Sequence, residues 1–250
     1  MKLLGGMVDF LTGDAILDEL DTRRGQGRRT LVGYHNLHTL YMARKEARLS
    51  GFCDRADIIY ADGMPLIMWA RLLGLAVTRD HRMTLSSWAP VVLRRFEKNG
   101  WRLFYLGATA EACAKGVSAF KELAPALEIE TRDGFFNAER HHPENRSLLE
   151  RIETFKPDVL MIGMGTPRQE LWIDDNLGDL DVPIVWSVGA AIEYFAGTKA
   201  RPPAFVGRLG LEWLFRLLSE PTRLWRRYLI EPAFLTPAMI DDLRRRLQKQ

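Results

Sequence analysis

Cysteine is scarce in this chain: only Cys53 and Cys113 occur in 250 residues. Neither has a second cysteine or a histidine at the spacing of a metal site, and two cysteines are too few for a small disulfide-rich domain. The sequence therefore excludes zinc modules and disulfide scaffolds as classes, and it is typical of a protein in a reducing compartment.

Long apolar runs are also missing. A membrane-spanning helix needs roughly 20 consecutive apolar residues, and the most apolar stretch, residues 66–77, is interrupted by Arg71. The amino terminus does not show the pattern of a signal peptide. We therefore expect a cytoplasmic protein that neither spans a membrane nor leaves the cell by the general secretory route.

Strong net charge is absent overall, at +3, but the charge is unevenly divided. Residues 199–250 contain 11 Lys/Arg and 5 Asp/Glu, whereas residues 1–198 contain 24 and 27. With 47% hydrophobic residues, the chain is long enough for one large core. We expect a domain at residues 1–198 and a basic appendage at residues 199–250.

From residue 30 onward, strand patterns alternate with helix patterns and short links. The expected strands are residues 30–34, 56–61, 101–106, 127–131, 158–163 and 182–188. The expected helices are residues 36–49, 65–73, 84–98, 109–123, 143–155, 167–177 and 190–196. This alternation predicts a Rossmann-like, doubly wound α/β fold with a mostly parallel sheet. Pro221, Pro232 and Pro237 cut the appendage into short helices.

The stretch from Met161 to Glu170 joins a buried strand to a helix through two glycines. Phosphorylated ligands bind at such places because unpaired N–H groups and the positive end of the helix dipole point there. Local capping is an equally good interpretation, with Thr166 as N-cap, Pro167 as first helical residue and Gln169 in a capping box. The missing G-x-G-x-x-G pattern argues against a dinucleotide cofactor.

Polar residues follow four strands at the edge where parallel strands would bring them together. They are residues 34–36, 62–63, 107–109 and 163–170. Asp62 is the foremost candidate, because a carboxylate at the carboxyl end of a strand can project into the ligand crevice and act as a general base. An ordinary Asp-Gly turn is the alternative.

Four arginines in the appendage recur at helical spacing: Arg216, Arg223, Arg226 and Arg227. Trp and Leu side chains are interleaved with them. Such a face fits an anionic membrane surface, a diphosphate bound by bidentate arginines, or a helix packed on its own domain with solvated arginines. Nucleic acid is not an expected partner, because residues 1–198 are net acidic.

Other polar clusters are interpreted as structural. His35 and His38 flank Asn36 without further metal ligands, so no metal site is expected there. The pairs at residues 174–175, 179–181 and 141–142 are expected to lie on the surface.

Together these stretches resemble the WecG/TagA/CpsF family of bacterial glycosyltransferases, from about residue 3 to residue 232. The motifs that carry the resemblance are NLHTL (36–40), ADGMPL (61–66), YLG (105–107), DGFF (133–136), GMGTPRQE (163–170), VGAA (188–191), AGT (196–198), LEWLFRL (211–217), EPTR (220–223) and RY (227–228). In this order and spacing they are specific.

The resemblance implies an inverting, metal-independent transferase that needs no cofactor. It would move a sugar from a UDP-sugar donor to a polyprenyl-diphosphate-linked glycan acceptor, in exopolysaccharide or other cell-surface polysaccharide biosynthesis. The protein would be peripheral on the inner face of the cell membrane, and self-association stays open. Asp62 is implied as the general base. The expected substrate-binding residues are Tyr34, Asn36, Arg82, Gly107, Gly163, Gly165, Thr166, Gln169, Glu170, Glu193, Arg216, Arg223 and Arg226.

Three positions depart from the family pattern. Tyr34 stands where a threonine is common, Glu193 where an aspartate is frequent, and the segment after Arg82 lacks its glycine and acid. The departures suggest a subgroup with a different sugar. Two other classes remain as alternatives: a non-catalytic membrane-surface adaptor, and a nicotinamide-dependent oxidoreductase without its glycine fingerprint.

Overall fold

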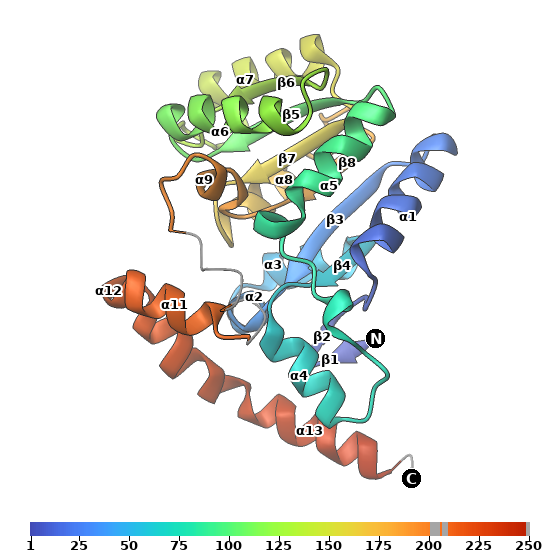
Figure 1. Ribbon diagram of the computed structural model, residues 1–250, viewed down its shortest axis with the longest axis vertical. Coiled ribbons are helices and arrows are strands. Elements are labelled where there is room, and N and C mark those ends of the chain that lie inside the picture. The colour runs from blue at the N-terminus through green and yellow to red at the C-terminus, as the bar shows by residue number, and fades with distance from the viewer. Residues whose placement is uncertain (201–205, 207–209, 249–250) are drawn as a thin grey trace.

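The computed structural model describes residues 1–200, 206 and 210–248. Its centre is a six-stranded parallel sheet with the order β4-β3-β8-β7-β5-β6 (Figure 1). The strands are β3 (Thr30–His35), β4 (Ile58–Ala61), β5 (Arg102–Gly107), β6 (Glu128–Arg132), β7 (Val159–Gly163) and β8 (Ile184–Ser187). A small antiparallel pair, β1 (Lys2–Leu3) and β2 (Gly6–Met7), lies beside it. The predicted α/β Rossmann-like fold is confirmed.

Helices cover both faces of the sheet, as the alternation predicts. One apolar core lies between the sheet and helices α1 (Gly13–Gly25), α5 (Leu85–Lys98), α6 (Ala110–Leu123) and α9 (Ala191–Phe195). A second lies under α3 (Ala47–Arg55), α7 (Pro143–Phe155) and α8 (Arg168–Asn176). Neighbouring strand residues such as Phe104 and Tyr105 belong to opposite cores, because successive side chains in a strand point to opposite faces.

One predicted helix is divided. Residues 36–49 form α2 (Leu37–Ala43) and the start of α3, with a break at residues 44–46. Asn36 caps α2 by accepting a hydrogen bond from the Thr39 N–H at 3.0 Å. Glu46 begins α3 by accepting from the Arg48 N–H at 3.2 Å. A second N-cap inside the apolar repeat therefore separates the two helices.

The connections diverge between β5 and β7. The chain runs from β5 through α6 outward to β6, whereas it runs from β7 through α8 inward to β8. Open α/β sheets bind ligands outside the carboxyl ends of strands at such a switch point. Gly107 and Gly163 pair here, and only glycine fits: a Cβ on Gly163 would lie 2.0 Å from the Tyr105 hydroxyl, and one on Gly107 would lie 2.4 Å from the Gly163 carbonyl oxygen.

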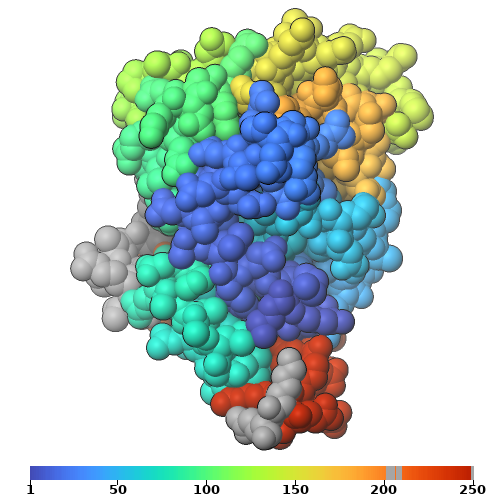
Figure 2. All heavy atoms as spheres, turned by 90° about the vertical axis from the view of Figure 1, so that its right-hand side faces the viewer, coloured from blue at the N-terminus to red at the C-terminus, as the bar shows by residue number. Residues whose placement is uncertain are grey.

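The carboxy-terminal tail packs against the amino-terminal half of the molecule. It comprises α11 (Glu212–Ser219), α12 (Pro221–Trp225), a π-helical turn η2 (Arg226–Ile230), a 3-10 turn η3 (Glu231–Leu235) and α13 (Thr236–Leu247). Leu235 and Ala238 are buried in a third core shared with β1 and α4 (Met64–Leu72). Figure 2 shows the end of the tail against α4 and the amino-terminal strands. In the described ranges, no helix combines the length and apolarity that crossing a bilayer requires.

Asp242 fastens α13 to that core. Its buried carboxylate accepts hydrogen bonds from the Leu4 N–H at 2.8 Å, the Trp69 indole N–H at 3.0 Å and the Arg245 guanidinium at 2.7 Å. A buried carboxylate is stabilised when its lone pairs are used in this way. The tail is therefore held at both the amino terminus and α4.

Candidate active site

A cavity of about 400 Å³ lies at the carboxyl ends of the central strands, covered by the tail helices. It is lined by nine of the residues expected from the sequence: Tyr34, Asn36, Asp62, Gly163, Gly165, Thr166, Glu193, Arg216 and Arg223. They come from five separate segments of the chain. The fold therefore brings most of the expected site into one place.

A second, smaller cavity of about 220 Å³ adjoins the first. Its walls include apolar side chains from α2, α4 and the tail: Leu37, Met64, Pro65, Trp213, Tyr228 and Pro232. Both cavities share Asn36, His38, Asp62, Thr84, Arg216 and Arg227. Asp62 thus lies where a polar cavity meets a largely apolar one.

Asp62 is fixed by hydrogen bonds to both carboxylate oxygens. Asn36 Nδ2 donates to Oδ2 at 3.2 Å, and the Thr84 hydroxyl donates to Oδ1 at 3.0 Å. The Asp62 N–H donates to the His35 carbonyl oxygen at 2.8 Å, and Gly63 turns the chain away with φ +100°. An ionised carboxylate has about four acceptor positions, so the side chain keeps acceptor capacity toward the cavities.

The Gln169 side chain bridges the glycine-containing loops that follow β7 and β8. Its Oε1 accepts from the Gly165 N–H at 3.2 Å and from the Gly189 N–H at 3.1 Å. The capping interpretation of this stretch is wrong: α8 begins at Arg168 without a side-chain cap, after a cis Thr166–Pro167 bond. A tertiary contact to the loop after β8 outweighs the local capping pattern.

Thr166 and Glu170 complete this wall. The Thr166 hydroxyl donates to Glu170 Oε1 at 3.1 Å, and Gln169 Nε2 donates to the same oxygen at 2.7 Å. Burial raises the pKa of Glu170 to about 7. The Tyr34 hydroxyl lies 3.4 Å from Thr166 Oγ1, and burial together with Glu170 raises the pKa of Tyr34 well above its usual value. Tyr34 therefore faces the cavity as a neutral phenol, with Gln169 and Glu170 behind it.

Arg216, Arg223 and Arg227 of the appendage line the larger cavity, together with Arg168 of α8. The Arg216 guanidinium lies 5.0 Å from the Tyr194 ring centre, and Arg223 pairs with Glu220 at 2.5 Å. Arg227 lines both cavities, and among the described residues no carboxylate lies within ion-pair distance of it. Arg226 lines neither cavity, and its guanidinium stacks 5.2 Å from the Trp225 ring centre.

The model of the glycosyl transferase WecG/TagA/CpsF family matches residues 1–248. The chain belongs to this family. Two curated relatives, from Staphylococcus aureus strains MRSA252 and MW2, are each described as N-acetylglucosaminyldiphosphoundecaprenol N-acetyl-beta-D-mannosaminyltransferase. Each is 28% identical over 196 residues, which cover 78% of this chain and 71% of the relative.

Five residues implied by the resemblance to the WecG/TagA/CpsF family do not line the larger cavity: Arg82, Gly107, Gln169, Glu170 and Arg226. Arg82 lines only the smaller cavity, where its Nη1 lies 2.9 Å from Glu212 Oε2. Gly107 does not line either cavity, although the next residue, Ala108, lines the larger one. Glu193, in place of the family's aspartate, is paired with Lys199 at 2.7 Å.

Sequence reasoning did not select His38, Thr84, Tyr194, Lys199 and Arg227 as site residues, although all five line the larger cavity. Arg227 was part of the cationic face, and His38 lies two residues after Asn36 in the same motif. No sequence pattern around Thr84 indicates a role in the site, because its contact with Asp62 forms only in the folded chain.

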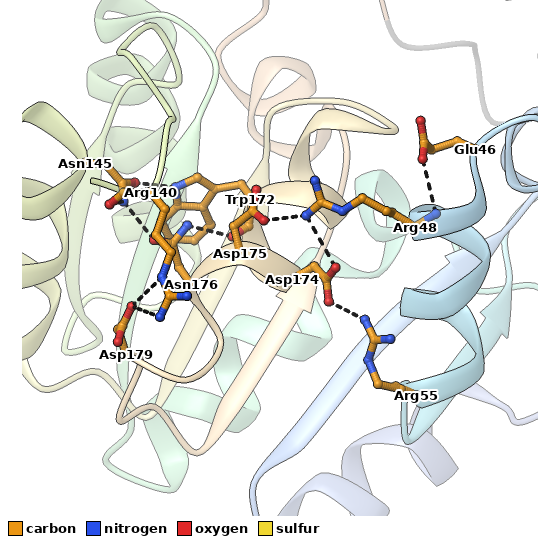
Figure 3. Close-up of polar contacts among 10 residues, drawn as sticks. All are labelled: Glu46, Arg48, Arg55, Arg140, Asn145, Trp172, Asp174, Asp175, Asn176 and Asp179. Carbon is orange, nitrogen blue, oxygen red and sulfur yellow. Dashed lines mark hydrogen bonds and ion pairs between the residues drawn. The ribbon is translucent and has the colours of Figure 1, made fainter. Parts of the chain in front are cut away.

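The acidic pairs outside this site are structural (Figure 3). On α8, Asp174 and Asp175 form ion pairs with Arg48 and Arg55 of α3. Nearby, Asp179 pairs with Arg140 at 3.0 Å. In the part of the chain that the structure describes, no three His, Cys, Asp or Glu side chains are grouped to hold a metal ion.

Proposed function

We propose that this protein is an inverting glycosyltransferase that moves a sugar from a UDP-sugar to an acceptor on a polyprenyl diphosphate, in cell-surface polysaccharide biosynthesis. The observation that carries the proposal is the position of Asp62 at the junction of a polar and an apolar cavity. Membership of the WecG/TagA/CpsF family supports it.

The larger cavity suits the donor. Its volume of about 400 Å³ is in the range of small-molecule sites. Gly163, Gly165 and Gly189 let a ligand approach the backbone, and Arg216, Arg223 and Arg227 offer guanidinium groups to a diphosphate. A nucleoside diphosphate needs this combination of a close backbone and concentrated positive charge.

The smaller cavity suits the acceptor. Its apolar walls, formed by α2, α4 and the tail, match the first isoprene units of a polyprenyl chain, and Arg216 and Arg227, which line both cavities, can meet the attached diphosphate. A sugar placed between the two cavities would bring its hydroxyl to Asp62. The relatives named above act on a diphosphoundecaprenol-linked sugar, which supports this assignment.

In the proposed mechanism, Asp62 takes the proton of the acceptor hydroxyl while that oxygen forms a bond to the anomeric carbon. The bond from this carbon to the diphosphate oxygen breaks, and UDP leaves with the electron pair, so the configuration inverts. The Gly165 and Gln169 N–H groups are already hydrogen-bonded within the protein. The appendage arginines, rather than this loop, would therefore balance the charge on departing UDP without a metal.

The outer side of the appendage fits an anionic membrane. Trp225, Leu229, Ile230 and Phe234 are exposed there, and Arg226 lies outside both cavities. Aromatic and aliphatic side chains beside arginines favour the lipid interface, where each cation contributes about 1 kcal/mol. This surface would hold the protein at the membrane that contains its lipid-linked acceptor.

A substrate screen tests the proposal. UDP release would be measured with a panel of UDP-sugars and a short-chain polyprenyl-diphosphate N-acetylglucosamine, beginning with UDP-N-acetylmannosamine. Acceptor-dependent UDP release with one donor would support the function. Binding to liposomes with no binding of UDP would instead favour a non-catalytic adaptor.

A further inference from the structure

His38 lies at the junction of the two cavities, in the first turn of α2. Its Nδ1 lies 2.6 Å from Oε2 of Glu231, in the tail segment η3. Both side chains are largely buried, with 22% and 12% of their surface exposed. A buried contact this short links the main domain directly to the appendage.

The direction of this hydrogen bond is fixed by its chemistry. A carboxylate oxygen only accepts, so His38 Nδ1 carries the proton and donates it to Glu231. The opposite nitrogen, Nε2, then carries the lone pair of a neutral ring. Burial, Arg227 and Arg223 lower the pKa of His38, while Glu231 opposes them. His38 and Arg227 both line the two cavities.

Arg227 lies in the π-helical turn η2, and Glu231 follows it by four residues, directly after that turn. Other contacts between η3 and α2 or the residues just after it lie farther out: the rings of Tyr41 and Phe234 are 5.6 Å apart, Lys45 Nζ lies 5.4 Å from the Phe234 ring centre, and Arg44 donates to the Phe234 carbonyl oxygen at 3.2 Å. Those residues line neither cavity. The His38–Glu231 bond is thus the polar contact that reaches the cavity wall beside Arg227.

We propose that His38 is a positioning residue: through Glu231 it holds η2 against α2, so that the Arg227 guanidinium stays at the junction of the two cavities and binds a diphosphate there. This inference rests on the proposed function, since the diphosphate is that of UDP or of the acceptor. It adds to that function a pair of residues that acts through Arg227 rather than on the substrate.

Two substitutions at position 38 distinguish the roles of the two ring nitrogens. His38→Asn places an amide N–H near the position of Nδ1 and retains the bond to Glu231. His38→Gln places its amide near Nε2 and loses that bond. Each would be made in the wild-type chain and in an Arg227→Ala background, with exposed His141→Gln as the control. Dissociation constants for UDP and inorganic pyrophosphate would be measured by calorimetry, together with kcat and KM and a thermal melt.

We expect His38→Gln and Arg227→Ala each to weaken pyrophosphate binding about tenfold, the loss of one well-placed charge-assisted contact. His38→Asn should stay close to wild type. In the Arg227→Ala background, His38→Gln should add nothing further, because residues that act through one another are not additive.

Three results would overturn the inference. A loss in His38→Asn as large as that in His38→Gln would show that keeping the bond to Glu231 does not preserve binding, and additive losses in the Arg227→Ala background would show that the pair does not act through Arg227. Unchanged pyrophosphate binding in Arg227→Ala would remove the anion site itself. If pyrophosphate binding follows the expected pattern but UDP does not bind, the proposed donor fails while the positioning role stands.

Discussion

Asp62→Asn is the most direct test of the proposed chemistry. The substitution keeps the shape of the side chain and removes its ability to take a proton. Thr84 can still donate to the new amide oxygen, but Asn36 Nδ2, 3.2 Å from Oδ2, would face a second donor. Asn36 is not free to rotate its amide, because its Oδ1 caps α2 through the Thr39 N–H. The structural cost is therefore one lost hydrogen bond, about 1 kcal/mol.

The catalytic cost should be much larger. Removal of a general base lowers turnover about 100-fold or more, which corresponds to at least about 2.7 kcal/mol in the activation free energy. UDP should bind nearly as in the wild type, because the appendage arginines and the glycine loops are unchanged. kcat would be measured by UDP release at saturating donor and acceptor, and UDP affinity by calorimetry. Asp54→Asn, on the exposed surface of α3, is the matched control.

The two readouts together decide the assignment. If kcat in Asp62→Asn stays above about a tenth of the wild-type value, the loss is within that of an ordinary hydrogen bond, and Asp62 is not the base. If kcat and UDP affinity fall in parallel, the carboxylate has a binding or structural role. Only a selective loss of kcat agrees with proton transfer at this position.

Three further predictions concern stability and membrane binding. Asp242→Ala should destabilise the fold by about 2–4 kcal/mol, because three donors lose their buried acceptor; urea unfolding measures this, and Asp241→Ala, on the exposed side of α13, should change little. Burial raises the pKa of Glu170 from 4.5 to about 7. The contribution of this carboxyl to the free energy of unfolding is therefore fully present below pH 4.5 and is lost as the pH rises through 7. Between pH 5 and pH 8, the free energy of unfolding of the wild type should therefore fall by up to about 3 kcal/mol relative to that of Glu170→Gln. An equal pH dependence of unfolding in the two proteins would contradict this. Leu229→Ser with Ile230→Ser should reduce sedimentation with anionic vesicles and leave UDP affinity unchanged; undiminished sedimentation would place the membrane contact elsewhere.

The fold was predictable because its signals are local. Apolar alternation along each strand and helical periodicity between strands require no knowledge of distant contacts, and right-handed crossovers then limit how such elements assemble. The divided helix at residues 44–46 was missed because apolar residues continue across the break. Glu46 was the available signal, as an acceptor placed to cap a new helix.

The site was predictable only in part, because several of its contacts are long-range. Asp62 was expected from its place after a strand, but its partner Thr84 comes from a different segment. His38 and Glu231 are 193 residues apart in the chain. Which of the two arginines, Arg226 or Arg227, lines the cavities depends on the direction in which the π-helical turn η2 points its side chains. Helical spacing in the sequence does not determine that direction.

The charges suggest why the proposed activity needs the appendage. Within the main domain, the larger cavity is lined by the carboxylates Asp62 and Glu193 and by Arg168, whose guanidinium donates to the Phe136 carbonyl oxygen at 3.0 Å. A diphosphate bound to the main domain alone would therefore meet two carboxylates and one arginine. Because Asp242 anchors α13 in the third core, the arginine-bearing turns are held over the cavity before any ligand arrives. Preorganised positive charge costs little reorganisation when UDP departs, so the tail would act as part of the catalytic site as well as a membrane contact.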